Sequence, residues 1–146
     1  MNGQIRWDGD VRFEAQSGSG HTLMLDGPPS AGGTNAGVRP MELLLLGVGG
    51  CASYDVVTIL QKARQPVTGC TARVEAERAA EPPKVFTRVN LHFVVEGHGL
   101  SDAKVERAVH LSADKYCSAS IMLQRGGVEV SHSFEVLEAP STGEIQ

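Results

Sequence analysis

Cys51, Cys70 and Cys117 are the residues of this sequence best suited to covalent chemistry. Cys51 and Cys117 each fall in a stretch with the pattern of a buried helix that faces the core. Burial alone makes a thiol inert, because the reactive form is the thiolate. Two buried thiols that meet can act together, one as the nucleophile and the other as the resolving thiol that closes a disulfide. We therefore take Cys51 and Cys117 as the candidate catalytic pair.

Cys70 has a simpler interpretation. It alternates with Ala72 and Val74 along one face of a strand expected over residues 67–79, so it is a small buried side chain without a catalytic role. An odd number of cysteines argues against a disulfide framework. The sequence has no CxxC motif and its five histidines are scattered singly, so we expect no metal site.

Composition narrows the class of protein. A chain of 146 residues with a net charge of −4 and few aromatic residues gives no reason to expect binding to nucleic acid or to an anionic membrane. Arg6, Asp8 and Asp10 interrupt any early apolar run, so no signal peptide is expected and a cytoplasmic location is predicted. We predict one domain over residues 1–139, followed by a disordered tail over residues 140–146.

An apolar stretch that carries Cys51 is predicted to form one helix over residues 40–64. Pro40 suits the first helical position, and Glu42 falls in the first turn, where the helix dipole favours a carboxylate. The apolar run approaches the length of a membrane span. Because Asp55, other polar residues and three glycines interrupt it, we predict instead a core helix that is buried on all sides.

The remaining elements follow from the period of the apolar residues. Alternation predicts strands over residues 4–8, 11–15, 21–25, 67–79, 85–96 and 128–136. A second helix, which carries Cys117, is expected over residues 102–124 with Ser101 as its N-cap. The order βββ-α-ββ-α-β predicts an α+β domain with antiparallel sheets and two core helices that bear the cysteines.

Several short motifs resemble the OsmC/Ohr family of thiol peroxidases and are most similar to its YhfA-like branch. They are Pro40-x-Glu42-Leu43-Leu44-Leu45, Gly49-Gly50-Cys51, Asp55-Val56-Val57, Leu91-His92-Phe93 and Lys115-Tyr116-Cys117-Ser118. The resemblance extends over nearly the whole chain. It implies an OsmC-like intertwined homodimer in which the helices that bear the cysteines lie in the core and two active sites lie at the dimer interface.

The resemblance also implies a function. Cys51 attacks the O–O bond of an organic hydroperoxide and becomes a sulfenic acid, and Cys117 then closes a disulfide with it. A dithiol, often a lipoyl group, restores both thiols, and no metal, haem or other cofactor takes part. A protein of this kind serves in defence against oxidative stress.

The family places a Glu and an Arg near the first cysteine, and here Met41 stands at the position of that Glu. At about 100° per residue, Glu42 lies on the opposite side of the helix from Cys51. Glu42, Arg39 and Asp55 are the candidate supporting residues. A buried Asp55 carboxylate one turn after Cys51 raises the thiol pKa unless a cation neutralises it. We therefore expect Asp55 to contact a basic or hydrogen-bonding group, such as Arg39 or an arginine of a partner chain.

Two other interpretations stay open. The protein can be a non-peroxidase member of the same fold, which binds a small apolar ligand or senses redox state through the same cysteine pair. The loop over residues 28–39 and the three glycines before Cys51 would line such a pocket. The least demanding interpretation is a structural dimer in which both cysteines are inert.

Overall fold

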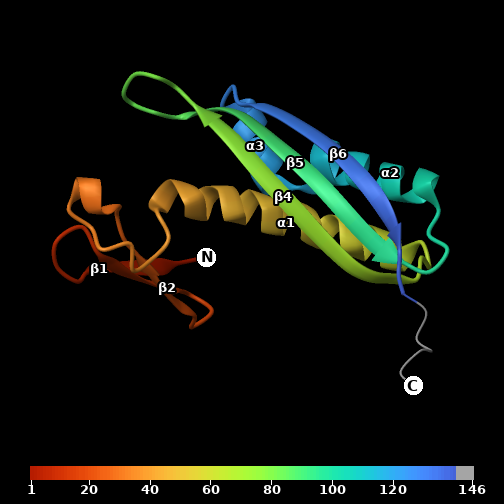
Figure 1. Cartoon of the computed structure of the whole chain (residues 1–146), viewed down its shortest axis with the longest axis horizontal. Coiled ribbons are helices and arrows are strands. Elements are labelled where there is room, and N and C mark those ends of the chain that lie inside the picture. Colours follow the sequence, from red (N-terminus) through yellow and green to blue (C-terminus); the bar gives the residue numbers. More distant parts are fainter. Residues whose placement is uncertain (141–146) are drawn as a thin grey trace. The chain divides into compact units, whose positions relative to one another are not determined.

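The structure is a computed structural model that describes residues 1–140, and it comprises two compact units (Figure 1). The first unit is Met1–Leu44 and the second begins at Leu45, so the boundary falls within the first turns of α1 (Pro40–Lys62). The single domain expected over residues 1–139 stays a prediction. The predicted tail lies, apart from Pro140, outside the described residues.

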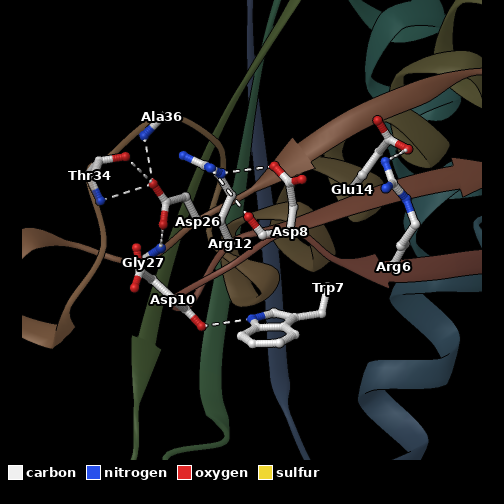
Figure 2. Close-up of polar contacts among 10 residues, drawn as sticks. All are labelled: Arg6, Trp7, Asp8, Asp10, Arg12, Glu14, Asp26, Gly27, Thr34 and Ala36. Atoms are coloured by element: carbon white, nitrogen blue, oxygen red, sulfur yellow. Dashed lines mark hydrogen bonds and ion pairs between the residues drawn. The ribbon is translucent and has the colours of Figure 1, made fainter.

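The first unit is a three-stranded antiparallel sheet in the order β1-β2-β3. Its strands are β1 (Gly3–Trp7), β2 (Phe13–Ser17) and β3 (Thr22–Leu25). The ends of these strands lie within one or two residues of those that the alternation of apolar residues predicted. Side chains fix the turn between β1 and β2, as Figure 2 shows. Arg12 donates to the Asp8 carboxylate at 3.1 Å, and the Trp7 indole donates to the Asp10 carbonyl at 2.9 Å.

A buried carboxylate organises the loop between β3 and α1. Asp26 is only 3% exposed and accepts four hydrogen bonds of 2.8–3.0 Å (Figure 2). The donors are the Ala36 and Gly27 N–H groups and both the hydroxyl and the N–H of Thr34. These donors, with the Ala36 N–H first among them, hold the pKa of Asp26 well below its usual range. The long loop is therefore fixed in place, and it includes a 3₁₀ turn over Pro29–Ala31.

The second unit is a three-stranded sheet in the order β4-β5-β6. Strands β4 (Val67–Arg78) and β5 (Phe86–Gly97) form the predicted antiparallel pair, but β5 and β6 (Glu129–Glu138) pair in parallel. The prediction of purely antiparallel sheets is wrong for this pair. The helical segment between β5 and β6 carries the chain back to the end of the sheet at which β5 begins. Two parallel strands require such a crossover connection.

That helical segment is not the continuous helix expected over residues 102–124. It consists of α2 (Asp102–Leu111), a π-helical turn over Ser112–Tyr116 and α3 (Ser118–Arg125). Cys117 adopts an extended conformation, with φ −69° and ψ 99°, between the π turn and α3. The Cys117 N–H still bonds to the Ser112 carbonyl at 2.8 Å, which closes the wider π turn and lets the chain start a new helix.

One face of α1 packs in the core of the second unit. The buried positions recur at helical spacing and are Val48, Gly49, Ala52, Val56 and Leu60. They pack against apolar side chains of β5 and α2, including Leu91, Phe93, Val95, Val105, Ala108 and Val109. A side chain at Gly49 would place its Cβ 2.6 Å from a methyl group of Val74, so glycine allows α1 to approach β4 closely.

The opposite face of α1 is not covered by the second unit, so burial on all sides is not achieved there and stays a prediction for an assembly of copies. Leu46 and Tyr54 are 58% and 72% exposed, and Gly50 lies between them on the same stripe of the helix. By length and composition α1 could cross a membrane, a property that core helices of soluble proteins share. Composition could not distinguish a helix covered by its own chain from one that leaves an apolar stripe uncovered.

Replacement of Asp26 should loosen its loop. In Asp26→Ala the Thr34 and Ala36 amides lose their acceptor, so their hydrogen exchange should accelerate by about 10-fold or more. Because the folded pKa is lowered, the charge of Asp26 stabilises the fold above the ordinary pKa of about 3.9, and this stabilisation disappears as pH falls through the folded pKa.

Chemical unfolding of wild type and Asp26→Asn at neutral pH and at about pH 3 tests this sign. The difference in stability between the two proteins should shrink at the lower pH. Glu14→Gln is the matched control, since Glu14 forms only an exposed ion pair with Arg6. Unchanged exchange in Asp26→Ala would contradict the role given to this carboxylate.

Candidate functional site

Helix α1 places Cys51 and Asp55 one turn apart, so both lie on the same side of the helix. Cys51 is half-buried and belongs to the border of the core, whereas its neighbour Ala52 is only 1% exposed. The buried stripe of α1 thus sets the rotation of the helix and holds Cys51 at the edge of the core.

The helix break places Cys117 opposite this part of α1. The buried Ser112 hydroxyl, at the start of the π turn, donates to the Ala52 carbonyl at 3.0 Å. This bond ties the segment before Cys117 to the residue that follows Cys51. Cys117 itself is fully buried, and its thiol lies in the core cluster with α1 and β5.

Cys117 is the N-cap of α3, with sulfur in the place that a Ser, Thr or Asp oxygen usually takes. Its Sγ accepts hydrogen bonds from the Ser120 N–H at 3.4 Å and the Ser120 hydroxyl at 3.2 Å. Sequence reasoning missed Ser120 and Ser112. The spacing Cys-x-x-Ser at a helix start was the available signal for Ser120, and nothing in the sequence marked Ser112.

The structure brings three candidate residues together. The Cys51 and Cys117 sulfurs and a carboxylate oxygen of Asp55 all lie within 4.8 Å of one another. Both thiols are free. A disulfide requires a sulfur–sulfur distance of about 2.05 Å, so side-chain rotation must bring the sulfurs closer before they can join. A soft divalent cation could also take these three ligands, whereas we expected no metal site from the pattern of cysteines and histidines.

Burial dominates the electrostatics of this cluster. It raises the pKa of the Cys117 thiol, the two Ser120 donors lower it, and the neighbouring Cys51 raises it again. Burial also raises the pKa of Asp55, whose Oδ2 is buried and accepts no hydrogen bond from the described part of the chain. Burial likewise raises the pKa of Cys70, which lies on β4 and packs at the border of the same core.

No residue of the second unit described here donates to the Asp55 Oδ2, and the contact expected with Arg39 or with an arginine of a partner chain stays a prediction. Arg39 donates to Glu42, from its backbone N–H and from its guanidinium, each at 2.9 Å. The Arg39 N–H is the main cause of the lowered pKa of Glu42. Glu42 and Arg39 thus form the N-terminal cap of α1, a structural role within the first unit.

The cavities described in the structure lie elsewhere. One is lined by residues between Asn2 and Gly18, and another by residues of β4 and β5 from Glu75 to Asn90. Neither includes a cysteine.

Comparison with known proteins identifies the family to which this chain belongs. The family model for OsmC-like protein matches residues 33–133. The chain is 44% identical to the Escherichia coli protein YhfA over 142 residues, which cover 95% of this chain and all of YhfA.

Solved structures agree with this match. A hypothetical protein from Aquifex aeolicus superposes with a TM-score of 0.82 at 27% identity, covering 95% of this chain and 97% of that one. An organic hydroperoxide resistance protein OsmC from Legionella pneumophila gives a TM-score of 0.68 at 20% identity, covering 92% and 96%, a likeness in fold alone. From its matched residues and its identity to YhfA, the chain belongs to the OsmC-like family.

Proposed function

We propose that this protein is a thiol-dependent peroxidase that reduces organic hydroperoxides through Cys51 and Cys117 in defence against oxidative stress. The observation that carries the proposal is the approach of the two free thiols to within 4.8 Å of each other. Family membership supports it, because structurally similar proteins are named organic hydroperoxide resistance proteins.

The different exposure of the two thiols supports different roles for them. Cys51 is half-buried and can meet a substrate, whereas Cys117 is fully buried and meets only groups of the protein. The Cys51 thiolate attacks the peroxide, so that a sulfur–oxygen bond forms, the O–O bond breaks and an alcohol leaves. The Cys117 thiol then displaces water from the sulfenic acid and closes the disulfide. A dithiol such as a lipoyl group, in the reducing cytoplasm, returns both cysteines to thiols.

Substitution of each cysteine tests these roles. Purified wild-type protein should consume cumene hydroperoxide faster than hydrogen peroxide, with dihydrolipoamide as the reductant. Cys51→Ser should consume neither above background. Cys117→Ser should complete one turnover and then stall as the sulfenic acid, detectable by mass spectrometry.

Cys70→Ser is the matched control for these variants, since Cys70 packs on β4 and belongs to neither role. It should turn over like the wild type. Turnover in Cys51→Ser equal to that of wild type would remove the peroxidase proposal, and a reversible Cys51–Cys117 disulfide without turnover would favour the redox sensor.

We propose further that the active protein is a homodimer. The stripe of Leu46, Gly50 and Tyr54 on α1 exposes apolar surface beside Cys51, and an added side chain at Gly50 would contact nothing within the chain. Glycine on an apolar helix face allows close approach of a second helix, and such a face is more stable when covered. A second copy that covers this stripe would also shield the thiol pair from water.

Charge on this stripe should weaken the dimer. Tyr54→Lys and Leu46→Glu should each raise the dimer dissociation constant by about 10-fold or more, because each buries a charge against an apolar face. Sedimentation over a range of concentrations measures this constant. Met122→Lys, at an exposed apolar residue of α3, is the control and should leave it unchanged. A wild-type protein that stays monomeric at every concentration would exclude the dimer.

A further inference from the structure

Two of the five histidines meet in the second unit of the fold. His110 lies near the end of α2, and His132 lies on β6, 22 residues later in the sequence. The His110 Nδ1 and the His132 Nε2 are 3.1 Å apart, and the two rings cross at 88°. Because the residues are far apart in the sequence, spacing could not predict this pair, and the thiol pair makes no use of it.

The packing of α2 against β6 brings the two rings together (Figure 1). His132 shares its face of the strand with three residues that pack against the core, Val130, Phe134 and Val136. It is half-buried on that face, whereas the His110 side chain is 56% exposed. The two nitrogens therefore meet at the border between the core and the solvent, where an ion from solution can reach them.

A carboxylate lies beside this histidine pair. Asp114 follows His110 by one turn, in the π turn, and its Oδ2 is 3.8 Å from the His110 Nδ1. The Asp114 side chain is 64% exposed, so it can change rotamer and approach the nitrogens more closely. The end of α2, the π turn and β6 thus supply two imidazole nitrogens and one carboxylate oxygen to a single place on the surface.

We propose that His110, His132 and Asp114 bind one zinc ion. Two Zn–N bonds of about 2.05 Å at a tetrahedral angle place their nitrogens about 3.3 Å apart, close to the separation of these two rings. The ion takes the place of the proton that the rings share in their hydrogen bond, and water fills the fourth position. Imidazole favours zinc and similar transition metals, whereas magnesium and calcium prefer oxygen ligands alone.

This site goes beyond the proposed peroxidase function and is independent of it. The bound ion joins the end of α2 and the π turn to β6, which is an edge strand of its sheet. Asp114 precedes Cys117 by three residues, so the ion also holds the segment that leads to the buried thiol. An ion that binds the folded chain and not the unfolded one stabilises the fold.

Calorimetric titration of the full-length chain with zinc tests this site. The parent protein for the titration carries Cys51→Ser and Cys117→Ser, because the thiol cluster could also bind zinc. One zinc ion should bind per chain. His110→Gln and His132→Gln should each raise the dissociation constant by about 100-fold or more, since loss of an outer-shell partner alone can cost that much. Asp114→Asn should raise it by about 10-fold, because two nitrogen ligands remain.

His98→Gln in the same parent protein is the matched control. His98 lies 3.8 Å from a carboxylate oxygen of Glu138, as His110 does from Asp114, but no other histidine of the second unit bonds to it. This variant should bind zinc as the parent does. An unchanged dissociation constant in both His110→Gln and His132→Gln would overturn the proposal, and so would a parent protein that binds no zinc at millimolar concentration.

Nuclear magnetic resonance of the wild-type protein keeps the inference testable if the substituted chains do not fold. Zinc should shift the ring nitrogen signals of His110 and His132 and leave those of His92 and His98 in place. Absence of a shift at both rings, or shifts confined to the surroundings of Cys51, would overturn the site. Neither measurement involves hydroperoxide turnover, so failure of the zinc site leaves the proposed function intact.

Discussion

The hydrogen bond between the Ser112 hydroxyl and the Ala52 carbonyl is the contact on which the geometry of the thiol pair depends. It joins the π turn that leads to Cys117 to the residue of α1 that follows Cys51, inside the core. A backbone carbonyl in a helix already accepts one bond, and the second bond fixes how far the π turn lies from α1. Loss of one partner from a buried pair costs about 1–3 kcal/mol, so this contact is a strong local constraint.

Much of the fold and the cysteine pair was accessible from the sequence. The period of the apolar residues located all six strands and α1, since half-buried strands and helices impose those periods directly. The proximity of Cys51 and Cys117 was expected because both lie among core residues. The parallel pairing of β6 was not, because strand direction depends on the crossover through α2 and α3 rather than on the composition of β6.

The remaining differences have physical causes in particular residues. The apolar pattern continues through residues 102–124, so its period could not locate the break at Cys117. There a wider π turn, closed by the hydrogen bond from the Cys117 N–H to the Ser112 carbonyl, ends the first helix and a second helix begins. Asp55 was expected to have a cation, because a charge inside an apolar helix needs one. Burial raises the pKa of Asp55, and no described residue of the second unit donates to its Oδ2. Sequence alone does not distinguish an ion-paired aspartate from a neutral one.

The cap that Cys117 forms on α3 has a consequence for the return half of a redox cycle. In a disulfide between Cys51 and Cys117, a dithiol from solution can reach the half-buried sulfur of Cys51 but not the buried sulfur of Cys117. Attack at Cys51 makes Cys117 the leaving group. Its negative charge would then develop between the Ser120 N–H and hydroxyl, at the positive end of a helix. The fold would thereby give such a disulfide a direction of cleavage.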